Sequence, residues 1–295
     1  MKTYLALVGT SLLVACSTVP SQQAATQPVE LRFLAEVNGQ AFECGQSYKN
    51  IGTTRSTMTP NDFRMFVSQV HLMTAEGKAV PVQLVQDSTW QLEGIALLDF
   101  ENGQGPCVNG TPPMNTVVRG IAPVGQYTGV KFTVGVPFER NHGDPTVAPA
   151  PLSSTAMFWT WQAGYKFIKF DASTSGRPLH TAQSAAHGSA SASGFSVHLG
   201  STLCASPART QAPSACQNPN RIDVTLIDFD LKKNQVVVDM GRVLARSNVD
   251  VNAPKTSPGC MSFPKDADCP LIMNALGLPY DGKAPSSPQQ FIIKR

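Results

Sequence analysis

The sequence predicts an all-β protein, a disulfide-stabilised β-sandwich with long loops. Apolar and polar residues alternate through many short segments, and clusters of Gly, Pro or Asn bound most of these segments. No long segment keeps the apolar period of about 3.6 residues that an amphipathic helix requires. Seven cysteines are present, and the six that follow Cys16 form an even number, which is typical of a disulfide framework. Many short strands separated by turn residues indicate packed sheets.

The composition limits the classes of function. Of 295 residues, 15% are charged and 42% are hydrophobic, and the formal net charge is only +3. A nucleic-acid-binding protein usually presents a strongly basic face, so we expect no nucleic-acid partner. After the N-terminal segment, no apolar run reaches the length of about 20 residues that a membrane-spanning helix needs. We expect residues 29–295 to form one domain.

The N-terminal segment resembles the signal of a bacterial lipoprotein. A positive start and an apolar stretch lead to small residues directly before Cys16. We expect removal of residues 1–15, lipidation of Cys16 and a flexible tether over residues 16–28. In similar Gram-negative lipoproteins, an uncharged residue such as Ser17 favours the outer membrane. The expected location is the periplasm, with a lipid anchor in the outer membrane; an ordinary signal peptide that contains a cysteine is the alternative.

The candidate strands follow one another through the rest of the chain. They share β-branched or aromatic residues and turn-forming boundaries. They span residues 29–37, 63–73, 127–136, 157–161, 165–171, 195–199, 222–229 and 236–244. Residues 172–194 are rich in Ala, Ser, Gly and Thr and are expected to form a long loop, in which His180 and His187 are read as solvated side chains.

The six remaining cysteines permit 15 pairings, and the sequence does not choose among them. Loop lengths favour two local pairs, Cys204 with Cys216 and Cys260 with Cys269, which leaves Cys44 and Cys107 for a long-range bridge. A zinc site is the alternative, but no C-x-x-C pair is present to support it.

Motifs of common enzymes are absent. The chain has no G-x-S-x-G or H-E-x-x-H motif and no glycine-rich phosphate loop. Oxidation of the six cysteines would also remove a thiol nucleophile. We therefore expect a protein that is not itself an enzyme.

The histidines and tryptophans are the candidate functional residues. His198 alternates with apolar neighbours on a predicted strand, and His142 lies in a turn where Asp144 could orient its ring. Met157, Trp159 and Trp161 share one face of another strand, where a packed core stripe is the simpler interpretation.

Longer strings then carry a family resemblance, which extends from about residue 30 to about residue 292. In chain order they are AFECGQSY, FRMFVSQVHL, Trp90-Gln91 followed by IALLDFENGQGPCVNGT, GVPFERNH, MFWTWQAGYKF, VHLGSTLC, CQNPNR and GCMSFPKDADCP. Together they resemble the MbnP-type periplasmic copper-binding proteins, the four-Cys-motif members of the metallo-mystery pair. The six cysteines here exceed that four-Cys motif, so a thiolate copper site becomes possible if two of them stay reduced.

The resemblance implies a β-sandwich that binds copper, with Cu(I) favoured. It also implies a partner similar to the di-haem cytochrome c peroxidase/MauG-like proteins, which converts a tryptophan of the WxW motif to kynurenine. Carried over to this chain, the motif falls on Trp159, our first choice for the oxidised residue, and Trp161. His142 and His198 lie within family strings and are the expected copper ligands.

Two further residues are weaker ligand candidates. Met157 could supply a thioether, although a gap-filling core residue is the more common role of such a methionine. His71 shares a strand face with Met73 and is a possible third imidazole.

A second function from another class stays open. The chain would then be a non-metal surface lipoprotein that binds a partner protein or a glycan, with its tryptophans merely packed. A multicopper oxidase is disfavoured, because five histidines are too few for several copper centres.

Overall fold

The computed structural model describes residues 25–160, 162–176, 194–208 and 211–295. Several predictions fall outside this part of the chain. They concern the signal peptide, the lipidated Cys16, Trp161, and the loop histidines His180 and His187. Among the described residues, no helix is long and apolar enough to cross a membrane.

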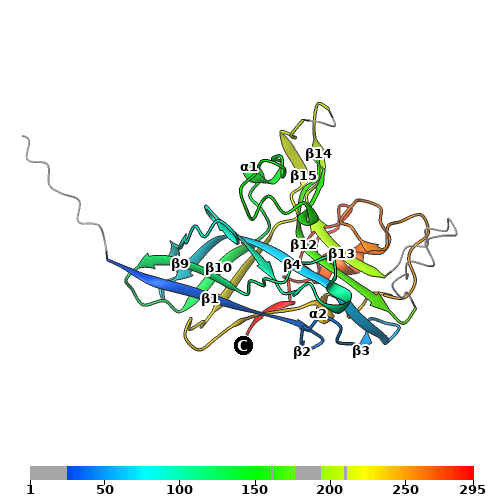
Figure 1. Cartoon of the computed structure of the whole chain (residues 1–295), viewed down its shortest axis with the longest axis horizontal. Helices are drawn as coiled ribbons and strands as arrows, with labels where there is room; N and C mark the ends of the chain where they lie inside the picture. Colours follow the sequence, from blue (N-terminus) through cyan, green and yellow to red (C-terminus); the bar gives the residue numbers. More distant parts are fainter. Residues whose placement is uncertain (1–24, 161, 177–193, 209–210) are drawn as a thin grey trace, which may run out of the picture.

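The described residues form two large β-sheets and a separate two-stranded hairpin, so the all-β prediction is confirmed (Figure 1). The smaller sheet has the order β19-β17-β1-β9-β6, with β2 paired to β1. Its strands are β1 (Thr26–Val37), β2 (Gln40–Ala41), β6 (Gln83–Leu84), β9 (Val117–Pro123), β17 (Val236–Asp239) and β19 (Ile292–Lys294). The pairing of β1 with β17 is parallel, whereas the other pairings in this sheet are antiparallel.

The larger sheet has the order β16-β10-β4-β12-β13-β18, and short strands extend it along β4, β8 and β12. Its path strands are β4 (Ser56–Met73), β10 (Gly129–Val134), β12 (Gly164–Thr174), β13 (Phe195–Gly200), β16 (Ile222–Ile227) and β18 (Gly259–Cys260). The added strands are β3 (Tyr48–Ile51), β5 (Ala79–Pro81), β7 (Gln91–Leu92), β8 (Ile95–Asp99) and β11 (Phe158–Thr160). The central position of β4 explains its fully buried run from Phe63 to Val67.

Aromatic side chains fill the core. Phe33 of β1 meets Phe132 of β10 with ring centroids 5.5 Å apart, which joins the two sheets. Phe63 packs edge-on against Phe42 and Phe170, at 5.7 and 5.5 Å. Such edge-to-face pairs stabilise a core beyond the area that they bury.

The short helices correct one strand prediction and add elements that the sequence patterns missed. The predicted strand at 236–244 ends at Asp239, where the chain enters α2 (Met240–Leu244). The Asp239 side chain accepts a hydrogen bond from the Gly241 amide at 2.9 Å, an N-cap that starts the helix. The other helical segments are η1 (Gly105–Cys107), α1 (Phe138–Asn141), η2 (Thr155–Met157) and α3 (Cys269–Ala275).

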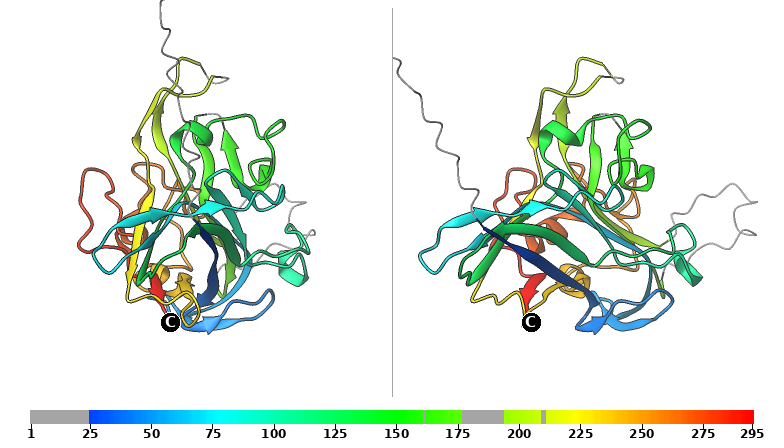
Figure 2. Two further views of the ribbon diagram at one scale, coloured as in Figure 1. Left: turned by 90° about the vertical axis from the view of Figure 1, so that its left-hand side faces the viewer. Right: turned by 60° about the vertical axis from the view of Figure 1, so that its left-hand side comes forward.

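Three disulfides tie the described chain together, in the pairing that the loop lengths favour. They join Cys44 to Cys107, Cys204 to Cys216 and Cys260 to Cys269. The second bridge lies in the hairpin of β14 (Thr202–Ala205) and β15 (Ala215–Asn218). Figures 1 and 2 show this hairpin extending beyond the sheets, beside α1.

Candidate metal centre

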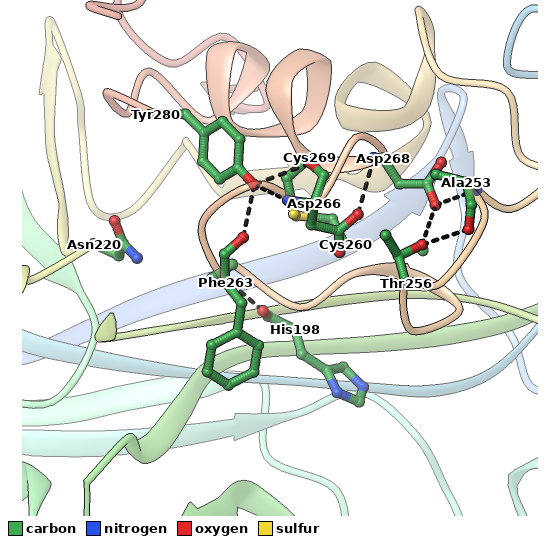
Figure 3. The surroundings of a disulfide bond; sticks show 12 residues. His198, Asn220, Ala253, Thr256, Cys260, Phe263, Asp266, Asp268, Cys269 and Tyr280 are labelled. Carbon is green, nitrogen blue, oxygen red and sulfur yellow. Dashed lines mark hydrogen bonds between the residues drawn. A yellow bond between two sulfur atoms is a disulfide. The ribbon is translucent and has the colours of Figure 1, made fainter. Parts of the chain in front are cut away.

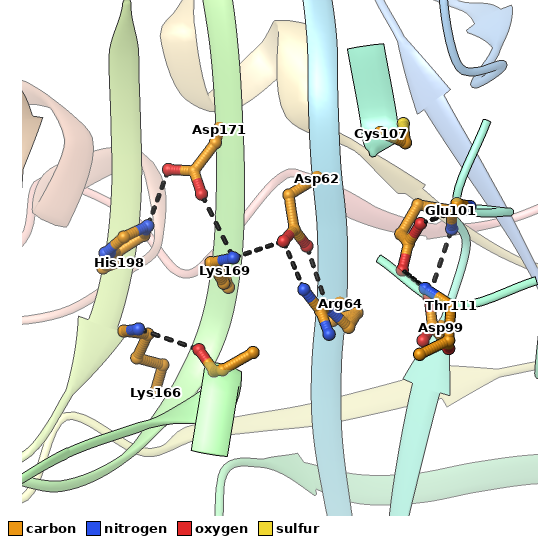
Figure 4. Close-up of polar contacts among 12 residues, drawn as sticks. Asp62, Arg64, Asp99, Glu101, Cys107, Thr111, Lys166, Lys169, Asp171 and His198 are labelled. Carbon is orange, nitrogen blue, oxygen red and sulfur yellow. Dashed lines mark hydrogen bonds and ion pairs between the residues drawn. The ribbon is translucent and has the colours of Figure 1, made fainter. Parts of the chain in front are cut away.

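His198 is held against a carboxylate on the neighbouring strand. Antiparallel pairing of β12 with β13 places Lys169 opposite His198 and Asp171 opposite Ser196. The His198 Nε2 lies 2.7 Å from Asp171 Oδ1 (Figure 4), and the Ser196 hydroxyl donates to the same oxygen at 2.5 Å. The His198 side chain is 11% exposed, so this contact is shielded from water.

A chain of alternating charges continues from this pair across the sheet (Figure 4). Lys169 lies 3.5 Å from Asp171 and also bonds Asp62, which in turn accepts from the Arg64 guanidinium. Burial raises the pKa of Asp171, but the hydrogen bond and charge of His198, together with Lys169, outweigh burial and lower the pKa well below its usual range. Asp171 is therefore a carboxylate at neutral pH.

The ionised Asp171 fixes the tautomer of His198. A carboxylate only accepts hydrogen bonds, so the proton lies on the Nε2 of His198. In the neutral form of the ring, the lone pair then lies on Nδ1. A histidine that donates one ring N–H to a carboxylate and offers the other nitrogen is the usual arrangement around a metal ligand.

Trp159 lies beside this histidine. Its ring centroid is 6.3 Å from that of His198 and 5.6 Å from that of Phe263, both at tilted angles. The indole packs directly over Gly200, since a Cβ at that position would lie 2.6 Å from the Trp159 Cζ3. The absence of a side chain at position 200 is therefore what lets the indole reach His198. Trp159 itself is half-buried.

A lysine also faces this end of the sheet. Lys166 is opposite Gly200 in the strand register, and its ammonium donates to the Ala156 carbonyl at 2.8 Å. Burial, and next the nearby charge of Lys169, lower the pKa of Lys166 to about 8. These cations are the counter-charges of the buried Asp62 and the half-buried Asp171.

The loop closed by the Cys260–Cys269 disulfide carries Phe263 (Figure 3). The Phe263 ring packs against Trp159. The Ser262 hydroxyl donates to the backbone carbonyl of His198 at 2.8 Å. The Tyr280 hydroxyl donates to the Phe263 carbonyl at 2.6 Å and accepts from the Asp266 amide at 2.8 Å. This loop therefore reaches both the His198 backbone and the indole.

His142 lies directly after α1 and has different neighbours. It is 5% exposed, and its Nε2 is 3.5 Å from Cys216 Sγ and 3.2 Å from Asn141 Nδ2. The same Asn141 nitrogen donates to the Ser201 hydroxyl at 3.3 Å. Because Ser201 is three residues after His198, roughly 10 Å of extended chain, both histidines lie at the same end of the larger sheet.

The structure places His71 away from this centre and Met157 in the core. His71 is seven residues farther along β4 than Arg64, which is up to about 23 Å of strand. Its Nδ1 lies 2.7 Å from the Gln69 carbonyl oxygen. Met157 has no exposed surface and belongs to the core cluster. It ends η2 and precedes β11, so it does not lie on the strand predicted for residues 157–161. Trp161 lies outside the described residues.

His198 and the unmodified Trp159 together offer a copper ion only one nitrogen ligand. The imidazole of His198 is a good ligand, but an intact indole offers only an N–H donor and cannot coordinate through it. Conversion of the indole to an aryl amine would add the missing nitrogen beside His198. The sequence patterns missed Asp171, Ser262 and Phe263, because strand register and loop closure bring them to His198.

Comparisons with known proteins agree with this architecture. A model of the MbnP family matches residues 26–262. Among solved structures, MbnP from Methylosinus trichosporium is similar, with a TM-score of 0.79 and 32% sequence identity. The match covers 92% of this chain and 98% of that one. No curated protein matches the chain. The chain belongs to the MbnP family of copper-associated, methanobactin-related proteins.

Proposed function

We propose that this chain is an exported, lipid-anchored copper-binding protein, which is not itself an enzyme and which serves as the substrate of a di-haem MauG-like partner. The observation that carries the proposal is that His198 contacts Asp171 on one side and lies beside Trp159 on the other. A carboxylate-oriented imidazole lies beside a half-buried indole at a position that glycine leaves open. Family membership supports the association with copper.

Oxidation of Trp159 would supply the ligand that the unmodified centre lacks. Two hydrogen peroxide molecules would each give one oxygen atom to the indole, one at C2 and one at C3, and leave as two waters while the C2–C3 bond breaks. Hydrolysis of the resulting formamide releases formate and leaves kynurenine, an aryl amine beside a ketone. The net change is the loss of one carbon and the gain of one oxygen. The amine nitrogen and the Nδ1 of His198 then form a nitrogen donor pair that suits Cu(I).

The disulfides and the N-terminal segment support a location in the periplasm. Three disulfides suit an oxidising compartment outside the cytoplasm. Lipidation at Cys16 would anchor the mature chain to the outer membrane, since several acyl chains on one residue give stable attachment. The partial exposure of Trp159 leaves its ring accessible to a periplasmic oxidant.

His142 is the second proposed imidazole of the copper centre. It lies at the same end of the sheet as His198 and is bound into the fold through Asn141, whose side chain oxygen accepts from the Tyr165 amide at 2.9 Å. In the structure the Nε2 of His142 lies 3.5 Å from Cys216 Sγ, in the hairpin. The contribution of His142 is therefore tested separately from that of His198.

The test is the copper content of protein that is made in the periplasm together with the haem partner and then passed through gel filtration. Wild type is expected to retain one copper per chain, and H198A is expected to lose most of it. H71A is the matched control, because it removes an imidazole at a distant point of the same sheet. Full copper retention by the double variant H142A/H198A would overturn the proposed site and favour a surface lipoprotein that binds a protein or a glycan.

A further inference from the structure

The hairpin of β14 and β15 carries a second group of soft donor atoms. The His142 ring nitrogen and the sulfurs of Cys204 and Cys216 all lie within 4.8 Å of one another. In the folded protein the two sulfurs form a disulfide, which cannot serve as a pair of thiolate ligands. Opening this one bond would leave two thiols and an imidazole around a single point.

The backbone of the hairpin is held by contacts other than the disulfide. Cys204 is directly opposite Cys216, with the Thr202–Asn218 pair on one side and the Ala205–Ala215 pair on the other. The Asn218 side-chain nitrogen Nδ2 donates to the Thr202 hydroxyl at 3.1 Å, and the Ser214 backbone N–H donates to the Ala205 backbone carbonyl at 3.0 Å. Residues directly opposite each other in an antiparallel pair project to the same face. Both thiols therefore stay on one face after the bond opens.

His142 is placed toward that face by contacts that do not involve sulfur. Asn141 ties this segment to Ser201 and to the Tyr165 amide, and the Phe138 ring lies 5.1 Å from the His142 ring. The imidazole is therefore supported by α1 and by β12, and reduction of the hairpin leaves that support in place.

The Cys204–Cys216 disulfide is also the one of the three in which neither cysteine is buried. Both of its cysteines are half-buried. By contrast, Cys107 is fully buried, although its partner Cys44 is half-buried, and Cys260 and Cys269 are both buried at 1% exposure or less. A dissolved reductant reaches exposed sulfur first, because thiol–disulfide exchange requires in-line approach of the attacking thiolate.

We propose that reduction of the Cys204–Cys216 disulfide by a dithiol creates a thiolate site for Cu(I), completed by His142. One thiolate of the dithiol attacks a hairpin sulfur and forms a mixed disulfide, and its second thiol then closes the dithiol into a disulfide. Two electrons and two protons pass to the cysteines. Cu(I) displaces the thiol protons, and soft thiolates with one imidazole are ligands that this ion prefers.

The consequence is a site whose affinity follows the redox state of the compartment. It holds Cu(I) while the thiols are reduced and releases it when an oxidant restores the bond. The proposal does not rest on the His198–Trp159 centre, since the three donors are adjacent whether or not that centre binds copper. The two sites share only His142, and the cysteine variants below leave His142 unchanged.

The experiment compares protein before and after mild dithiol treatment, without air and after removal of the dithiol. Cu(I) is supplied as its acetonitrile complex, and native mass spectrometry counts the bound ions. Alkylation followed by peptide mapping identifies which cysteines were reduced. Reduced wild type is expected to gain one copper over the oxidised protein, with a new near-ultraviolet thiolate-to-copper absorption band. C204S/C216S is expected to gain none.

The controls separate this site from loss of fold and from the centre at His198. H198A is expected to gain the extra copper after reduction, whereas wild type that is alkylated before copper addition is not. Alkylated wild type also covers the case in which C204S/C216S fails to fold. The proposal is overturned if reduced wild type gains no copper, if the alkylated protein gains as much, or if the mapped thiols are those of another disulfide, Cys44–Cys107 or Cys260–Cys269.

Discussion

At the scale of single residues, Asp171 orients His198, the first proposed copper ligand. This carboxylate accepts hydrogen bonds from the side chains of His198 and Ser196, and its low pKa keeps it ionised in the folded protein. A ligand histidine that loses such a partner also loses its fixed ring orientation and part of its basicity. Asp171 therefore acts on the metal through His198, without being proposed as a ligand.

D171N is expected to weaken copper binding by roughly 10- to 100-fold, the usual effect of removing the partner of a ligand histidine. A competition titration with a chelator of known Cu(I) affinity measures this change. The control is D228N, which alters an exposed acid at a turn, where asparagine tolerates the positive φ of 52°. Equal affinity in D171N and D228N would remove Asp171 from the account.

G200A tests the packing of the indole. The new Cβ would lie 2.6 Å from Trp159 Cζ3 and 2.8 Å from the Tyr165 carbonyl oxygen, so the ring must move. Overpacking of this kind costs about 1–3 kcal/mol of stability. We expect a shifted tryptophan emission spectrum and reduced conversion to kynurenine. G94A is the control, since its Cβ meets nothing within 4 Å; the same spectral change in both variants would contradict the packing model.

Asp99 predicts how stability varies with pH. Burial, and next the charge of Glu101, raise its pKa to about 7, so the folded state binds a proton that the unfolded state releases above its own pKa near 4. Stability from this group is present below pH 4 and is lost as the pH rises toward 7, with a slope of at most about 1.4 kcal/mol per pH unit. Urea unfolding between pH 4 and 7 should show a shallower decline for D99N, and an unchanged slope would contradict this assignment.

At the scale of elements, the loop between Cys260 and Cys269 positions the site. Tyr280 anchors this loop through its hydroxyl, which bonds the Phe263 and Asp266 backbone. Without that anchor, Phe263 would no longer be held against Trp159. The loop therefore connects a disulfide, a helix start and the indole in one unit.

Y280F is expected to leave the Asp266 amide without its acceptor and to cost about 1–3 kcal/mol of stability. The same variant should also speed loss of copper, because the cover over Trp159 loosens. Thermal unfolding and copper release rates measure the two effects. Y127F is the control, since that hydroxyl bonds an exposed backbone carbonyl at Pro123. Identical release rates in the two variants would show that the loop does not cover the centre.

A strand or helix could be predicted from the sequence where one pattern, such as the alternation of apolar and polar residues, allowed only one structure. The alternation in residues 29–37 identified β1, because one face of that strand is buried. The segment 236–244 misled, since its apolar run suits a buried strand and a buried helix equally. Only the cap at Asp239 separates the two. The helix α3 begins at the disulfide cysteine Cys269 and is too short to show a periodic pattern.

At the scale of the whole molecule, the order of the strands in the larger sheet brings the residues around His198 together. Asp171 and His198 meet because β12 and β13 are adjacent, and the long connection between them separates these residues in sequence. Loop 260–269 reaches them through β18, which pairs in parallel with β13. The resemblance to a family was enough to name His198 as an expected copper ligand and Trp159 as the expected oxidised residue. It could not indicate Asp171 or Phe263, since neither strand register nor loop packing can be read from local sequence patterns.

The most direct test of the account is a native and intact mass spectrum of the chain without its lipid anchor, made in the periplasm with the haem partner. The account predicts a species that carries one copper, with one tryptophan altered by the loss of a carbon and the gain of an oxygen. Fragmentation should place this change at Trp159. A metal-free species with three intact tryptophans, even after copper is supplied, would contradict the account.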